Sequence, residues 1–114
     1  MSDIEEFQNQ REKLQALMME KSDKTMKRFL NLDTQVYADG ALPAKEKELL
    51  GLVASLVLRC EDCINYHIVQ CHKLGLKEDE LVEAMSVGLI VGGSITIPHI
   101  RRAFKSWDEL ENKP

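Results

Sequence analysis

Two cysteines and a histidine stand close together in the run CEDCINYH, which spans residues 60–67. The spacing of Cys60 and Cys63 allows the two thiols to form a disulfide and to return to the reduced state. His67 follows Cys63 by four residues, so on a helix its imidazole lies on the same face and can handle the proton that thiol chemistry moves. The sequence therefore predicts a redox-active pair of thiols with a proton carrier beside it.

Glu48 is the candidate for a further member of this group. If helices over residues 44–58 and 61–74 run antiparallel and meet near Arg59, Glu48 lies about 16 Å and His67 about 12 Å from the turn. Two side chains can span that difference, and a carboxylate in contact with His67 would orient the ring and raise its basicity. The predicted relay runs from Glu48 through His67 and a water molecule to Cys63. The alternatives are a solvated helix start for Glu48 and a structural role for His67.

The two residues between the cysteines oppose this chemistry. Glu61 and Asp62 are both acidic, and their negative charge disfavours a thiolate beside them. The unpaired N–H groups in the first turn of a helix, and a protonated His67, favour a thiolate instead. The sequence leaves the balance between these effects open.

Zinc binding by the same residues is a competing interpretation, because thiolates and imidazoles are zinc ligands. Cys60 and Cys71 would lie about 16 Å apart along one continuous helix, so the full set cannot converge on one ion. Cys60, Cys63 and His67 could approach a metal only with a ligand from another part of the chain. We therefore expect no metal and no organic cofactor. The other residues of ligand type are interpreted as packing or surface residues: Cys71, His72 and His99.

Composition predicts one globular domain over residues 1–114, with 44% hydrophobic and 30% charged residues and a net charge of −4. The absence of a basic stripe argues against nucleic acid as a partner. No apolar run approaches the roughly 20 residues that span a membrane, and the charged first twenty residues do not resemble a secretion signal. Three cysteines make a poor disulfide framework, which favours a cytoplasmic protein with redox-active or metal-binding thiols.

Apolar periodicity predicts an all-α fold, a bundle of about six helices. Two helices are expected within residues 3–38, and the core that bears the motif, about 44–98, contains helices over 44–58, 61–74 and 77–91. A last helix is expected from Pro98 to about Leu110. Ile95-Thr96-Ile97 alternates like a strand but is too short to form one. The helices over 44–58 and 77–91 are apolar on nearly all sides, which predicts a homo-oligomer with helices packed across its interface.

The pattern Glu48-x11-Cys60-x2-Cys63-x3-His67, followed by Leu74-Gly75-Leu76 and an acid-rich helix start, resembles the carboxymuconolactone decarboxylase/AhpD-like (alkylhydroperoxidase) family. The resemblance extends from Glu48 to about Pro98, and the first forty residues resemble the family only in being helical. It implies an all-α oligomer, trimeric or hexameric in relatives. It also implies a thiol-dependent peroxidase or disulfide reductase that uses a peroxide or disulfide substrate and an external dithiol reductant.

Carried over by position, the resemblance makes Cys63 the attacking thiol, Cys60 the thiol that resolves the sulfenic acid, and Glu48 with His67 the proton relay. The decarboxylase branch of the family lacks the cysteine pair, so decarboxylation of a muconolactone is an alternative, as is a non-enzymatic helical oligomer. AhpD itself carries a histidine just before its second cysteine, where this chain has Asp62. This difference should make Cys63 less acidic and should favour disulfide exchange over fast peroxide reduction.

Overall fold

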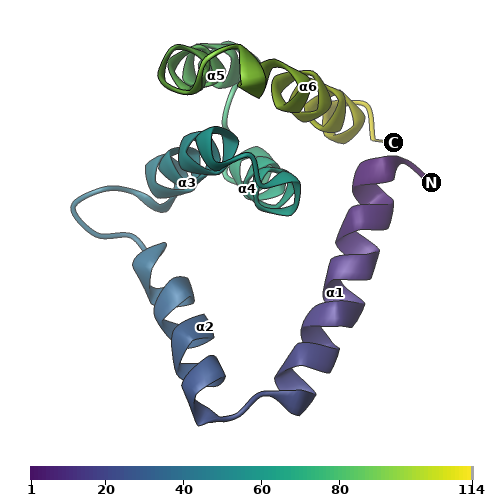
Figure 1. Cartoon of the computed structure of the whole chain (residues 1–114), viewed down its shortest axis with the longest axis vertical. Helices are drawn as coiled ribbons and strands as arrows, with labels where there is room; N and C mark the ends of the chain where they lie inside the picture. Colours follow the sequence, from purple (N-terminus) through teal and green to yellow (C-terminus); the bar gives the residue numbers. More distant parts are fainter. Residues whose placement is uncertain (114) are drawn as a thin grey trace.

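The computed structural model describes residues 1–113, and these residues form helices without any strand (Figure 1). The all-α fold of about six helices is thus confirmed. The elements are α1 (Asp3–Lys21), α2 (Lys24–Val36), α3 (Ala44–Leu58), α4 (Glu61–Lys73), α5 (Glu78–Gly92), the 3-10 turn η1 (Ser94–Thr96) and α6 (Ile97–Glu111).

The predicted element boundaries hold to within a few residues, with one correction. The second helix was expected to end near Asp39, but α2 ends at Val36. As expected, the short alternating segment 95–97 is not a strand; the 3-10 turn η1 runs directly into α6 there. Gly75 ends the α4 region with a positive φ of 86°, the left-handed conformation expected of a glycine at this position.

The connection between α3 and α4 brings the two helices into contact and places the cysteine pair. Arg59 adopts a left-handed conformation with φ of 59°, and its backbone N–H donates to the Leu56 carbonyl. The Cys60 N–H then donates to the Ser55 carbonyl at 3.1 Å. With only Arg59 and Cys60 between them, α3 and α4 fold back against each other, and α4 starts directly after the first cysteine.

The core lies between two pairs of helices, with α5 and α6 stacked on α3 and α4 (Figure 1). Each of the four helices contributes fully buried apolar side chains, so burial of apolar surface holds the pairs together. The principal members are Leu52, Leu56, Ile64, Ile68, Leu81, Met85, Ala103 and Trp107.

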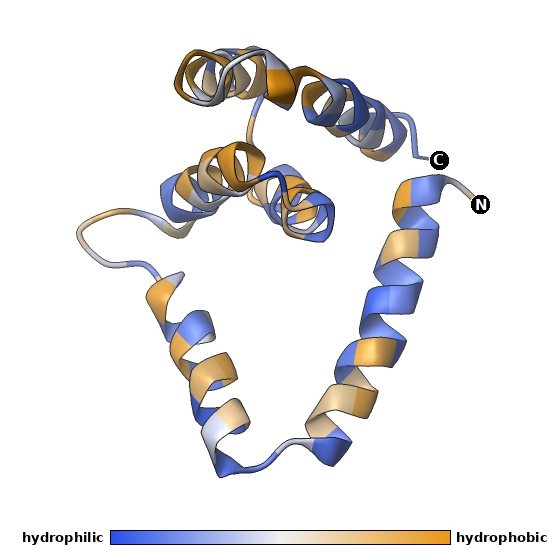
Figure 2. Ribbon diagram, viewed as in Figure 1, coloured by the Kyte–Doolittle hydropathy of each residue, from blue (hydrophilic) through white to orange (hydrophobic). Residues whose placement is uncertain are grey.

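The first two helices extend from this core as a V-shaped arm (Figure 1). Ile4 is the single buried residue among those of α1, and α2 buries none of its described residues. Figure 2 shows apolar residues along α2, and its exposed members are Met26, Phe29, Leu32 and Val36. The helix α5 also leaves apolar side chains exposed, namely Val82, Val87, Ile90 and Val91. Among the described helices, none combines the length and the apolar character that crossing a membrane requires.

Candidate active site

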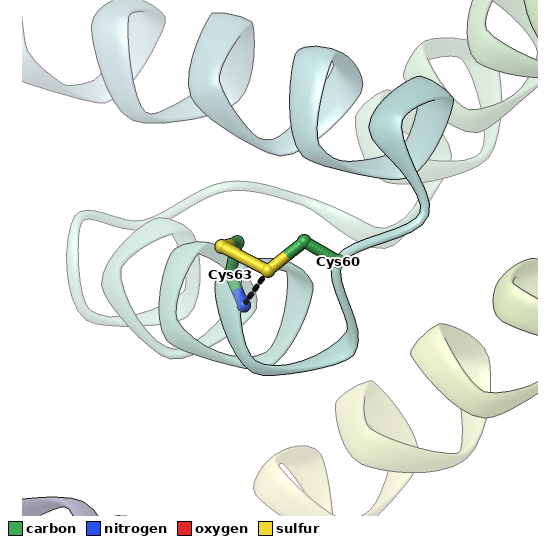
Figure 3. The surroundings of a disulfide bond; sticks show 2 residues. All are labelled: Cys60 and Cys63. Atoms are coloured by element: carbon green, nitrogen blue, oxygen red, sulfur yellow. Dashed lines mark hydrogen bonds between the residues drawn. A yellow bond between two sulfur atoms is a disulfide. The ribbon is translucent and has the colours of Figure 1, made fainter.

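Cys60 and Cys63 form a disulfide at the beginning of α4 (Figure 3). Cys60 lies just before the helix, as its N-cap, with φ of −97° and ψ of 101°, an extended conformation. This conformation brings the two Cα atoms to 5.2 Å, within the usual range for a disulfide. The Cys63 backbone N–H donates to the Cys60 sulfur at 3.3 Å. The same N–H and the positive end of the helix dipole would stabilise a Cys60 thiolate in the reduced protein.

The two sulfur-bearing residues differ in their access to solvent. Cys63 is exposed, whereas Cys60 is half-buried. Cys63 also lines a cleft of about 240 Å³, together with Arg11, Asp33, Asp62, Tyr66 and His67. An incoming substrate or thiol therefore reaches Cys63 more readily than Cys60.

Glu48 and His67 meet in the interior beside this cleft. Glu48 Oε1 lies 3.1 Å from His67 Nδ1, and the two residues are only 4% and 8% exposed. The sequence predicted this contact, because the rise per residue along two antiparallel helices places Glu48 and His67 at nearly the same distance from the turn. A carboxylate on Nδ1 fixes the orientation of the imidazole and leaves Nε2 as the nitrogen that can exchange a proton.

Two aromatic rings and a glycine enclose the imidazole of His67. The ring centroids of Tyr37 and Tyr66 lie 5.4 Å and 5.2 Å from that of His67. Burial, followed by the nearby charge of Glu48, raises the pKa of both tyrosine hydroxyls, so both phenols stay protonated. A Cβ atom on Gly51 would lie 2.7 Å from His67 Cε1, 2.9 Å from Nε2 and 2.9 Å from the Tyr37 hydroxyl. Gly51 thus leaves the space that the imidazole occupies.

The charge on the rim of the cleft comes from three side chains. The guanidinium of Arg11, on α1, lies 4.1 Å from the centroid of the Tyr66 ring, a cation–π contact. Asp33, on α2, and Asp62, on α4, are the acids that line the same cleft. The first two helices therefore contribute to the surroundings of Cys63 although they bury little of their own surface.

Glu61, the acid that follows Cys60, is bonded to side chains of α6. Arg102 Nε donates to Glu61 Oε1 at 2.7 Å, and His99 Nδ1 contacts the same oxygen. Burial raises the pKa of the Glu61 carboxyl, but the hydrogen bonds and charges of Arg102 and His99 outweigh burial and hold that pKa below its ordinary value. His99 is therefore a partner of the first turn of α4 and not only the packing or surface residue that the sequence suggested.

The remaining cysteine and histidine lie apart from this cleft. Cys71 is buried and forms no disulfide, and burial, followed by the charge of Glu48, raises the pKa of its thiol to about 12. His72 packs edge-on against Trp107, with ring centroids 5.1 Å apart. Within residues 1–113, no three side chains of Cys, His, Asp or Glu are grouped so that they could hold a metal ion. The zinc interpretation thus gains no support.

Several residues around the cleft were not predicted from the sequence. Gly51 did carry a signal in the sequence. A glycine inside a helix lowers helix stability by about 1 kcal/mol relative to alanine, so its presence suggests that a side chain would clash at this position. Arg11, Tyr37 and Asp33 carried none, since their positions depend on how α1 and α2 lie against the rest of the chain. Arg102 likewise carried no signal in the sequence, because it is 41 residues from Glu61 and meets it only through the packing of α6 against α4.

Comparison with known proteins gives the class to which this fold and site belong. The sequence profile of the carboxymuconolactone decarboxylase family matches residues 23–106, so the chain belongs to the carboxymuconolactone decarboxylase family. Among curated proteins, the chain is similar to uncharacterized protein 4 in the cox locus of Paracoccus denitrificans. The two are 29% identical over 83 residues, and this aligned region covers 73% of this chain and 75% of that protein.

Solved structures agree with this assignment. The chain is 48% identical to TM1620 of Thermotoga maritima, with a TM-score of 0.90 and coverage of 93% of both chains. In a second crystal structure, with a TM-score of 0.89, TM1620 is described as a carboxymuconolactone decarboxylase family protein with a possible involvement in antioxidative response. A family member from Legionella pneumophila, lpg0406, shares the fold at 23% identity, with a TM-score of 0.87 over 96% of this chain and 97% of that one.

Proposed function

We propose that this protein is a thiol-dependent oxidoreductase that reduces a peroxide or a disulfide with the Cys60–Cys63 pair. The observation that carries the proposal is the disulfide whose exposed member, Cys63, shares a cleft with a histidine bonded to a buried carboxylate. The antioxidative role suggested for TM1620 lends support from a relative at 48% identity. Decarboxylation, the alternative activity, would not use the two adjacent thiols.

In the proposed cycle, His67 takes the proton from the Cys63 thiol through a water molecule, and Glu48 stabilises the resulting imidazolium. The Cys63 thiolate attacks a peroxide oxygen, the O–O bond breaks, and the leaving alkoxide receives the proton as an alcohol. Cys63 is then a sulfenic acid. Cys60 attacks its sulfur, water leaves, and the disulfide forms. With a disulfide substrate, Cys63 forms a mixed disulfide and Cys60 displaces the second thiol.

An external dithiol completes the cycle by attacking the exposed Cys63 sulfur. Cys60 then leaves as a thiolate, which the Cys63 N–H and the helix start stabilise. A second attack within the mixed disulfide releases Cys63 and the oxidised reductant, so two electrons pass from the dithiol to this protein. Such reductants belong to a reducing compartment, which supports the cytoplasm as the place of action.

We further propose that the protein acts as a homo-oligomer, trimeric or hexameric as the family resemblance implies. The exposed apolar residues of α2 support this, because Phe29 is 70% and Val36 62% exposed in the single chain. A second copy of the chain would cover such a stripe. Light scattering after size-exclusion chromatography measures the mass directly, and a monomer at micromolar concentration would contradict this part of the proposal.

Turnover of a panel of peroxides and disulfides with dithiothreitol as the reductant tests the proposed chemistry. Cys63→Ser should abolish turnover, whereas the matched control Cys71→Ala removes a buried thiol outside the cleft and should retain it. In parallel, mild oxidation of the wild-type protein should remove two titratable thiols per chain reversibly. If Cys63→Ser turns over substrate as fast as the wild type, Cys63 is not the nucleophile. If the wild-type protein turns over none of these substrates, the proposed enzymatic activity is wrong.

A further inference from the structure

We propose that Arg102 of α6 is a positioning residue for the thiol pair, which sets its reduction potential by binding and neutralising the carboxylate of Glu61. This inference rests on the proposed function in one respect only, namely that Cys60 and Cys63 cycle between thiols and disulfide. It does not depend on which oxidant the protein reduces.

The contacts of Glu61 identify Arg102 as its main partner. Both Nε and Nη2 of Arg102 lie 2.7 Å from Glu61 Oε1, a charge-assisted pair of contacts to one oxygen. His99, which is mostly buried, contacts the same oxygen and lies 3.4 Å from Arg102. The side chain of Glu61 is therefore drawn toward α6.

The position of Glu61 makes its charge matter for Cys60. The two residues are adjacent, with Cα atoms about 3.8 Å apart. The carboxylate and the thiol therefore lie at a separation comparable to the roughly 8 Å over which physiological salt screens a charge. An unpaired carboxylate there would destabilise the Cys60 thiolate that the helix start favours. A cation on that carboxylate removes most of the penalty. The acidic residue after the first cysteine is thus compatible with thiol chemistry because α6 compensates it.

The sign of the effect follows from the redox equilibrium. A stabilised thiolate favours the dithiol state, which makes the disulfide more oxidising. Loss of Arg102 should therefore favour the disulfide and lower the reduction potential. Because the Arg102 side chain is 53% and that of Glu61 35% exposed, solvent weakens the interaction, and we expect a threefold to tenfold shift, about 15 to 30 mV, rather than a larger one.

The experiment measures the equilibrium between dithiol and disulfide in redox buffers of glutathione at pH 7, with full-length protein. Arg102→Met should shift the equilibrium toward the disulfide by about threefold to tenfold, and Arg102→Lys should restore most of the difference. The matched control is Arg101→Met, which removes the same charge from an exposed neighbour that forms no ion pair with the described residues. It should leave the equilibrium unchanged.

A double variant separates local compensation from damage to the fold. Adding Glu61→Gln to Arg102→Met removes the uncompensated carboxylate, so the equilibrium should return to within about twofold of the wild type. Equal values for wild type and Arg102→Met, or an equal shift in Arg101→Met, would overturn the inference. A wild-type pair that equilibrates with glutathione but turns over no substrate would defeat the proposed enzyme and leave this inference standing. A pair that never forms a reversible disulfide would defeat both.

Discussion

Gly51→Ala offers the sharpest test of the packing around His67. The added methyl group would lie 2.7 Å from His67 Cε1 and 2.9 Å from Nε2, whereas carbon atoms in contact are normally about 3.5–4.0 Å apart. The imidazole must therefore move by roughly 0.8–1.3 Å. Its hydrogen bond to Glu48, now 3.1 Å, cannot survive unchanged. Because a displacement of about 1 Å can cost 10²-fold in rate, we expect turnover to fall by about 10- to 100-fold.

The Gly51→Ala variant should remain folded, so that a loss of activity reports on the site. Overpacking costs about 1–3 kcal/mol, but replacing glycine by alanine inside a helix returns about 1 kcal/mol. A net loss of about 0–2 kcal/mol leaves the protein folded. Urea unfolding measures this loss, and initial rates with a peroxide and a dithiol measure the activity.

Gly88→Ala is the matched control for this variant. A Cβ atom at Gly88 would lie 2.5 Å from Leu56 Cδ2, so the substitution overpacks the contact between α5 and α3 without touching His67 or Glu48. We expect it to lower stability and to retain most of the turnover. Full activity in Gly51→Ala, or equal losses of activity in both variants, would refute the reasoning that Gly51 holds space for the imidazole.

Two further predictions concern proton transfer and the third thiol. Glu48→Gln keeps the shape of the side chain but removes its charge, so turnover should fall by about 10²-fold and its pH dependence should weaken; an unaltered pH–rate profile would remove Glu48 from the relay. Because the pKa of Cys71 is raised to about 12, this thiol stays protonated at pH 8. Iodoacetamide should then modify two thiols per chain in the reduced native protein and the third only after denaturation. Rapid native labelling of Cys71 would contradict its burial.

Local sequence patterns were sufficient to predict the helices and the contact between Glu48 and His67. Apolar periodicity, the acid-rich start at Glu78 and the glycine at position 75 determine where helices begin and end, and these signals act over a few residues. The contact between Glu48 and His67 could be anticipated because two consecutive helices with a short connection must fold back on each other, and the helical rise then sets which residues meet.

The surroundings of the thiols were decided by tertiary structure. Whether Glu61 opposes a thiolate depends on Arg102 and His99, which lie 41 and 38 residues away in the sequence. The place of Arg11 over Tyr66 depends in the same way on where α1 packs against α4. Periodicity within a helix states which of its faces is apolar, but it does not state which side chains of a distant helix that face meets. The sequence by itself therefore determined which thiol, imidazole and carboxylate groups come together, because these lie on two consecutive helices. The packing of α6 and α1 determined the charge and the space around those groups, because it brings in side chains from distant parts of the chain.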